Sequence, residues 1–87
     1  MFSEYRRKGL LVVGAKQTLK LLNEEKLKEI YIAQDADKYV IRSIEELAED
    51  RAITIIYVES MKKLGKECGI SIGAATAGIV KQMTDDN

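Results

Sequence analysis

Four short runs of β-branched and aliphatic residues stand out along the chain. None alternates strictly between apolar and polar positions, which is typical of strands covered on both faces. The segments between them carry apolar residues at helical spacing. We therefore expect strands at Leu10–Val13, Glu29–Ala33, Thr54–Val58 and Ala75–Val80.

The longest helical pattern begins after Asp37, a residue type that caps helix starts. Its aliphatic side chains share one face, and its glutamates lie outside that face. The aliphatic set is Val40, Ile41, Ile44, Leu47 and Ala48, and the glutamates are Glu45, Glu46 and Glu49.

A second helix is predicted from Met61 to Cys68, capped by Ser60 and stopped by Gly69. Its inward face comprises Met61, Leu64 and Cys68, and its outward face is basic, with Lys62, Lys63 and Lys66.

Two further helical segments complete the pattern. Ala15–Leu22 directs Leu19 and Leu22 inward, and Ser3–Lys8 adds about one helical turn. Strands that alternate with helices make crossovers, and such crossovers give parallel neighbours in the sheet. The fold class is therefore α/β: a three-layer α/β/α sandwich with a small four-stranded mixed sheet, built by residues 1–87 as a single domain.

Composition agrees with a folded protein of one domain. The chain has 87 residues, of which 46% are hydrophobic and 32% are charged. No apolar run approaches the roughly 20 residues that span a bilayer, and the charged opening lacks the apolar stretch of a signal peptide. We expect a cytoplasmic protein without membrane contact.

The residue inventory argues against catalysis. Cys68 is the one cysteine and there is no histidine, so an internal disulfide, zinc-type ligation and a histidine base are all excluded. The remaining catalytic candidates are Asp35, Asp37 and Cys68. Asp37 is better explained as a helix cap, and Cys68 as a small buried residue at a helix end. We expect no enzyme activity, metal or cofactor.

Charge is unevenly distributed although the net charge is zero. Met1–Lys28 holds seven basic and three acidic residues, a net of +4, whereas Glu29–Asp50 holds two basic and seven acidic ones, a net of −5. Such a layout would steer a polyanion to one side of the fold.

The segment GAKQTLK, from Gly14 to Lys20, places Lys16, Gln17 and Lys20 on the outside of a helix start. A lysine there is unfavourable by ~0.3 to 1 kcal/mol, because the unpaired N–H groups already carry positive partial charge. Bound phosphate would remove that cost, and a glutamine can pair with base edges. The alternative is that all three are ordinary solvated residues.

The segment from Leu64 to Val80 is punctuated by glycines, which permit close approach of backbone to backbone. Between two of them, Ile70–Ile72 is apolar where a connecting loop is normally polar. The tripeptide either tucks into the core or offers a surface to an unstacked base.

Four stretches together resemble the kink-turn RNA-binding ribosomal protein family, the L-seven-Ae family, and particularly its short bacterial members. They are GAKQTLK, AQDADK (Ala33–Lys38), LAED (Leu47–Asp50) and VESMKKLGKECGI (Val58–Ile70). The resemblance implies an α/β/α sandwich that binds kink-turns, which are sharp bends in duplex RNA built on sheared guanine–adenine pairs beside a three-nucleotide bulge.

The resemblance also implies site residues. Gly14 matches the glycine that opens the site, and Lys16, Gln17 and Lys20 match positions that touch the sheared pairs and the neighbouring backbone. Archaeal members carry Asn and Glu where this chain has Lys16 and Gln17, which adds a charge for phosphate and removes a carboxylate acceptor. The remaining predicted RNA contacts are the bulge-capping loop Ile70, Ser71, Ile72 and Gly73, the basic position Lys28, and Lys62, Lys63 and Lys66 as secondary phosphate contacts.

We therefore expect a monomeric, ribosome-associated protein that binds kinked RNA by shape, without chemistry. The alternative is a protein-interaction module that docks a partner through Ile70–Ile72, with the lysines merely solvated. The C-terminal helix of many longer family members is not expected, because the chain ends soon after its last predicted strand.

Overall fold

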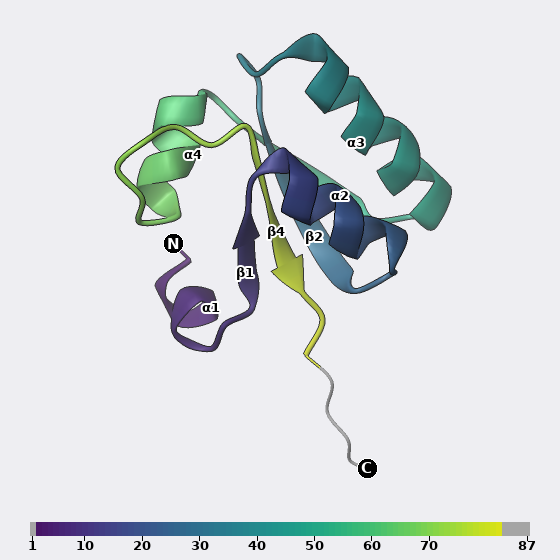
Figure 1. Ribbon diagram of the computed structural model, residues 1–87, viewed down its shortest axis with the longest axis horizontal. Coiled ribbons are helices and arrows are strands. Elements are labelled where there is room, and N and C mark those ends of the chain that lie inside the picture. The colour runs from purple at the N-terminus through teal and green to yellow at the C-terminus, as the bar shows by residue number, and fades with distance from the viewer. Residues whose placement is uncertain (1, 83–87) are drawn as a thin grey trace.

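The computed structural model describes residues 2–82 and has four helices and four strands (Figure 1). The expectation that no helix follows the last strand concerns residues 83–87, which lie outside the described part. The elements are α1 (Ser3–Arg7), β1 (Leu11–Val13), α2 (Ala15–Asn23), β2 (Leu27–Ala33), α3 (Lys38–Arg51), β3 (Thr54–Val58), α4 (Met61–Glu67) and β4 (Thr76–Val80).

The sheet has the strand order β1-β4-β2-β3. Its last strand, β4, runs antiparallel to both β1 and β2, whereas β2 and β3 are parallel. Consequently β1, β2 and β3 all point the same way. The helices that follow them, α2, α3 and α4, all begin at one end of the sheet, which we call its carboxyl end.

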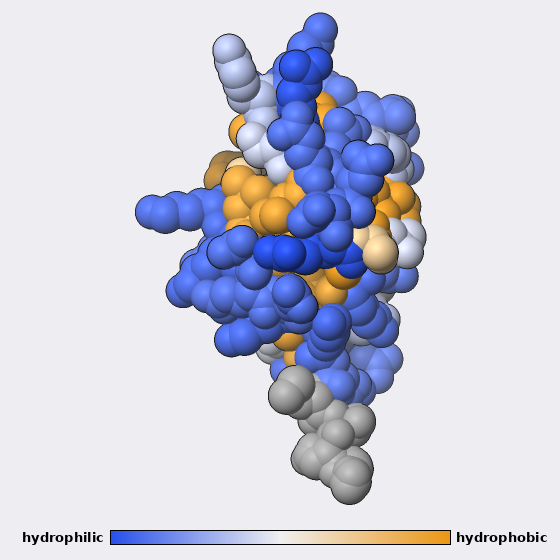
Figure 2. Space-filling model, turned by 90° about the vertical axis from the view of Figure 1, so that its right-hand side faces the viewer, coloured by the Kyte–Doolittle hydropathy of each residue, from blue (hydrophilic) through white to orange (hydrophobic). Residues whose placement is uncertain are grey.

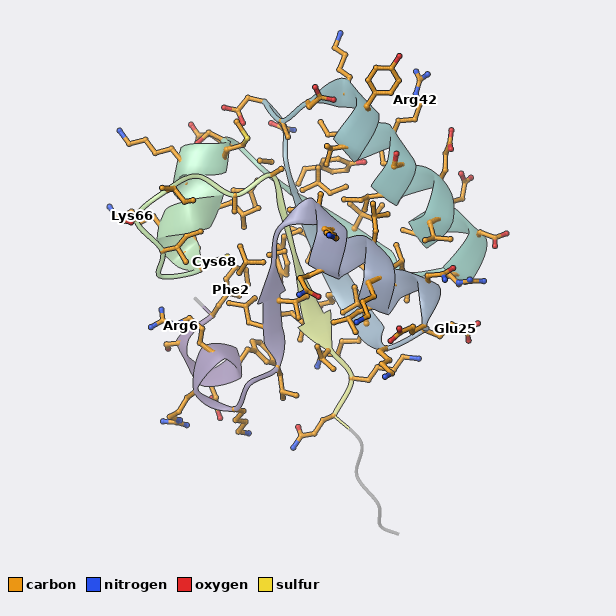
Figure 3. The ribbon with its side chains drawn as sticks, in the orientation of Figure 1. Phe2, Arg6, Glu25, Arg42, Lys66 and Cys68 are labelled. Carbon is orange, nitrogen blue, oxygen red and sulfur yellow. The ribbon has the colours of Figure 1, made fainter. Side chains whose placement is uncertain are left out.

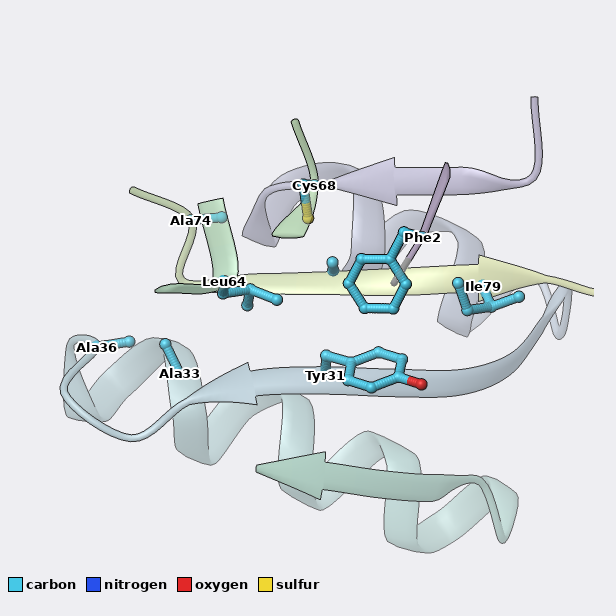
Figure 4. Packing of buried hydrophobic residues seen from close by; sticks show 9 residues of the cluster. Phe2, Tyr31, Ala33, Ala36, Leu64, Cys68, Ala74 and Ile79 are labelled. Carbon is cyan, nitrogen blue, oxygen red and sulfur yellow. The ribbon is translucent and has the colours of Figure 1, made fainter. Parts of the chain in front are cut away.

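Two hydrophobic clusters fill the spaces above and below the sheet. One lies between the sheet and α1 with α4, and Figure 4 shows Phe2, Leu64 and Cys68 meeting Tyr31 and Ile79 there. The rings of Phe2 and Tyr31 are 4.7 Å apart, edge to face. The other cluster joins the opposite sheet face to α2 and α3 through Leu22, Ile30, Ile32, Ile44 and Ala48. The three-layer sandwich with a mixed sheet is therefore confirmed.

The predicted burial of the strands is right for the centre of the sheet and wrong for its edge. Nearly every residue of β2 and β4 is buried or half-buried. In β3, however, Ile56 and Tyr57 are 37% and 47% exposed. β3 is an edge strand with a neighbour on one side alone, although β1, the other edge strand, is half-buried throughout.

Both predicted helix caps are confirmed. The Asp37 carboxylate accepts a hydrogen bond from the backbone N–H of Tyr39 at 2.8 Å, and the Ser60 hydroxyl accepts one from that of Lys63 at 3.1 Å. These bonds satisfy N–H groups that have no partner within the helix. The starts of α3 and α4 are thus fixed by side chains at the carboxyl end of the sheet.

Candidate nucleic-acid interface

Gly14 joins the start of α2 to the start of β4. Its backbone has a φ of 103°, a conformation that side chains other than glycine rarely adopt. In this conformation its N–H donates to the carbonyl oxygen of Thr76 at 2.9 Å. The two segments singled out from the sequence are therefore brought together at the carboxyl end of the sheet.

Thr76 holds this junction in place. It is fully buried, and its hydroxyl donates to the backbone oxygen of Tyr31 at 2.7 Å while its own carbonyl accepts from Gly14. Sequence analysis did not single out Thr76. The available signal was a hydroxyl residue at the beginning of an otherwise apolar strand.

The predicted contacts at the start of α2 all face solvent. Lys16, Gln17 and Lys20 are exposed, and among residues 2–82 neither lysine takes part in an ion pair. Their positive charges are thus available to a ligand, because no carboxylate of the described residues neutralises them.

The loop from Ile70 to Gly73 lies on the surface beside α4. Ile72 is 73% exposed and Ile70 is 36% exposed, so the alternative in which this tripeptide tucks into the core is wrong for Ile72. The loop approaches α4 closely because Gly65 has no side chain. A Cβ at Gly65 would stand 2.0 Å from the carbonyl oxygen of Ile72. The backbone N–H of Ala74 then donates to the Met61 oxygen at 3.0 Å.

Asp35 ties the turn before α3 to the beginning of α4. Its carboxylate accepts from the backbone N–H of Met61 at 2.7 Å. This positioning role was not predicted from the sequence, because Asp35 was considered there only as a catalytic candidate. An aspartate directly after a buried strand was the signal for it.

The opening turns of α2 and α3 carry cations where the helix dipole favours acids. Neither first turn contains an acid, although Asp37 caps α3 and the last turns hold Lys20 and Arg51, where cations are favoured. A cation in the first turn costs ~0.3 to 1 kcal/mol. The cations of the opening turns are Lys16, Lys38 and Arg42. Both helices therefore present cations to the carboxyl end of the sheet.

The N-terminal basic segment is divided by the fold, contrary to the expectation of one basic side. Because α1 precedes β1 and α2 follows it, the cations of α1 lie at the opposite end of the sheet from Lys16 and Lys20 (Figure 1). On the α3 side, the surface is largely hydrophilic, with apolar residues gathered near its middle (Figure 2).

Lys28 is likewise separated from the other predicted contacts. It lies four residues before Ile32, the partner of Thr76 in the β2–β4 ladder, or about 13 Å away along the strand. Its amine stands 5.5 Å from the centre of the Tyr5 ring on α1. Lys28 therefore belongs to a different surface.

Lys62, Lys63 and Lys66 are exposed on α4, as expected. Lys66 points outward, away from α2 (Figure 3), and the amine of Lys63 is 3.6 Å from the carboxylate of Glu59. At the end of the helix Cys68 is buried, and this burial raises the pKa of its thiol. Such a thiol is a packing group rather than a nucleophile.

Within residues 2–82, no helix is long and apolar enough to cross a membrane. In the same range, no group of three or more acidic, cysteine or histidine residues could hold a metal ion.

Curated proteins of similar sequence cover most of the chain. An RNA-binding protein of Halalkalibacterium halodurans is 54% identical over 71 residues, which make up 82% of this chain and 87% of that protein. An RNA-binding protein of Caldanaerobacter subterraneus subsp. tengcongensis is 51% identical over 69 residues, or 79% of this chain and 84% of that protein.

Solved structures share the fold. The Giardia lamblia 15.5kD RNA binding protein matches with a TM-score of 0.84 and 26% identity, over 92% of this chain and 68% of that one. A Bacillus halodurans protein of unknown function matches with a TM-score of 0.81 at 17% identity, over 88% and 77%, which is evidence for the fold alone. The model of the Ribosomal protein L7Ae/L30e/S12e/Gadd45 family matches residues 2–86. On this match and on these relatives, the chain belongs to that family.

Proposed function

We propose that this protein binds structured RNA and recognises kink-turns with the carboxyl end of its sheet. Relatives that share about half of its residues are named RNA-binding proteins, and so is a solved structure of the same fold. The family description includes ribosomal proteins, so ribosomal RNA is the first target to test.

One observation carries the proposal: the hydrogen bond from Gly14 to Thr76 joins a cationic helix start to the strand that directly follows an exposed apolar loop. A sharp bend in RNA crowds phosphates on its inner side and leaves bases without stacking partners. The first feature calls for lysines, and the second calls for apolar cover. A surface that offers both in one place is matched to bent RNA rather than to a straight duplex.

Each residue then has a distinct role. Lys16 and Lys20 neutralise crowded phosphates, and Gln17 pairs with a base edge, since its amide both donates and accepts. The loop of Ile70, Ser71 and Ile72, ended by Gly73, covers the unstacked bases. Lys62, Lys63 and Lys66 provide further phosphate contacts along α4, and Lys28, about 13 Å further along β2, is a separate contact to test.

The test is a titration against one kinked RNA and the same duplex without its bulge, at two salt concentrations. We expect tighter binding to the kinked RNA and a steep loss of affinity as salt rises. Equal affinity for the two RNAs would refute kink recognition.

The exposure of Ile72 also favours a second candidate, a protein-interaction module that docks a partner on the apolar loop. This candidate predicts RNA binding that is weak and indifferent to the bulge. The same titration therefore separates the two functions.

A further inference from the structure

Tyr39 is a large aromatic side chain that the fold does not use. It lies in the first turn of α3, and 85% of it is exposed, more than either Tyr57 or Ile72. Its ring belongs to neither hydrophobic cluster. In the described part of the chain it makes no contact with another ring, and its hydroxyl forms no hydrogen bond.

The backbone beneath this ring is fixed. The N–H of Tyr39 donates to the Asp37 carboxylate at 2.8 Å, and its carbonyl oxygen accepts from the Ser43 hydroxyl at 2.8 Å. Packing an aromatic side chain buries ~150 to 250 Å². The ring of Tyr39 stays exposed although its backbone is held by two hydrogen bonds, and this arrangement suits a side chain that contacts a ligand.

Two cations are near neighbours of Tyr39 along α3. Lys38 precedes it, and Arg42 lies one turn further along the same helix, at the top of the molecule in Figure 3. The acids nearest in sequence, Asp35 and Asp37, face the backbone N–H groups of Met61 and Tyr39. An aromatic ring between cations suits a nucleic acid, because bases stack on the ring while cations meet the phosphates.

The helix that carries the ring begins at the same end of the sheet as the proposed kink-turn surface. The start of α2 follows β1 and the start of α3 follows β2, and β4 alone separates these strands. Two strand spacings put the axes of β1 and β2 about 10 Å apart. One bound RNA is therefore large enough to meet both helix starts.

We propose that Tyr39 is a stacking platform for an unpaired RNA base next to the kink, with Lys38 and Arg42 on its phosphates. This inference rests on the proposed function and extends the interface from α2 onto α3. A protein partner fits less well, because the aliphatic residues next to the ring, Val40 and Ile41, pack against the hydrophobic core.

The experiment compares Tyr39→Ala and Tyr39→Phe with wild type. The probes are the kinked RNA with short unpaired extensions on either strand, carrying 2-aminopurine at each unpaired position in turn, and the same RNA without extensions. A stacked base is worth ~1 to 3 kcal/mol, so Tyr39→Ala should weaken binding of an extended RNA by about 5- to 100-fold. Tyr39→Phe should bind like wild type, and quenching of one 2-aminopurine should vanish with Tyr39→Ala alone.

Tyr57→Ala is the matched control. Tyr57 is the other strongly exposed tyrosine, but its hydroxyl bonds to Glu45 in the acidic part of α3, a surface unfavourable to RNA. This variant should leave affinity for the extended RNAs unchanged. Circular dichroism checks that each variant is folded.

Unchanged affinity of Tyr39→Ala for every extended RNA overturns the stacking platform, while a retained preference of the wild type for kinked over straight RNA leaves the proposed function standing. A loss shared by Tyr39→Phe overturns stacking in favour of a hydroxyl contact. A loss shared by Tyr57→Ala shows a general effect of removing a tyrosine and equally overturns the inference. If Tyr39→Ala impairs capture of a protein and not of RNA, the residue serves protein docking.

Discussion

At the scale of single residues, substitutions of Ile72 can distinguish the loss of an apolar contact from the effect of an added charge. Its side chain is 73% exposed, so a polar replacement leaves the core intact. We predict that Ile72→Asp and the neutral Ile72→Asn both weaken binding of the kinked RNA by about tenfold or more, since each loses the burial of an aliphatic side chain against a base, worth ~1.5 to 3 kcal/mol. Fluorescence titration measures this loss.

The neutral variant decides the cause. If Ile72→Asn binds like wild type, the effect of Ile72→Asp is mere repulsion of phosphate, and the role given to this loop is wrong. Ile72→Leu retains an apolar surface and should bind within a few-fold of wild type.

At the scale of elements, the lysine in the first turn of α2 has opposite effects on stability and on the proposed RNA binding. Lys16 lies in the first turn, where a negative charge is favoured. We predict that Lys16→Glu raises the free energy of unfolding by ~0.6 to 2 kcal/mol, because it removes an unfavourable charge and adds a favourable one, and markedly weakens RNA binding. Urea denaturation and RNA titration measure the two effects.

Glu46→Gln serves as the control, because Glu46 is exposed on α3 beyond its basic first turns. It should change RNA affinity little. Were Lys16→Glu to bind RNA as tightly as wild type, the cations at the helix starts would have no part in recognition.

The contact between α4 and its loop depends on Gly65. A Cβ there would lie 2.0 Å from the Ile72 oxygen and 3.0 Å from the Gly73 Cα, both backbone atoms. We predict that Gly65→Ala lowers the free energy of unfolding by ~1 to 3 kcal/mol, as overpacking does, and displaces the RNA-covering loop. Thermal melting and RNA titration would show both losses.

The exposed neighbour Lys66→Ala should melt like wild type, because its side chain points away from the core (Figure 3). A Gly65→Ala variant with unchanged melting temperature would mean that the loop moves freely away from the helix.

Much of this organisation could be predicted from local sequence. Spacing predicted the helices, and Asp37 and Ser60 predicted two of their starts, because capping is a matter of a few adjacent residues. The exposure of Ile56 could not be predicted, since the place of β3 at the edge of the sheet depends on pairing between distant segments. The separation of Lys28 from the start of β4 could not be predicted either, since it depends on the register of β2 against β4. The same holds for the charge at the carboxyl end, which becomes visible once three strands are known to be parallel.

At the scale of the whole molecule, the ionisation of Tyr31 makes the stability of the fold depend on pH in the alkaline range. Burial, followed by the negative charge of Glu29 and a 3.2 Å hydrogen bond to it, raises the pKa of Tyr31 from 10.0 to about 12. The unfolded chain therefore loses this proton first. The stabilising contribution is complete below pH 10 and is lost as pH rises toward 12.

We predict that stability falls across this interval and that Tyr31→Phe makes the fall shallower. Burial also raises the pKa of Cys68, so part of the fall remains in the variant. Urea midpoints at pH 9, 10.5 and 12 measure the slope, with Tyr39→Phe as the exposed control. Identical slopes for wild type and Tyr31→Phe would contradict this assignment.

The position of β4 between β1 and β2 also determines when, during synthesis, the sheet and the candidate interface can form. The strand that precedes α2 pairs with β4 alone, and the carbonyl that accepts from Gly14 belongs to Thr76, 62 positions later. A nascent chain that has not yet exposed this last strand outside the ribosome has neither a paired β1 nor a fixed loop. Under the proposed function, RNA recognition therefore begins after nearly the whole described chain has emerged.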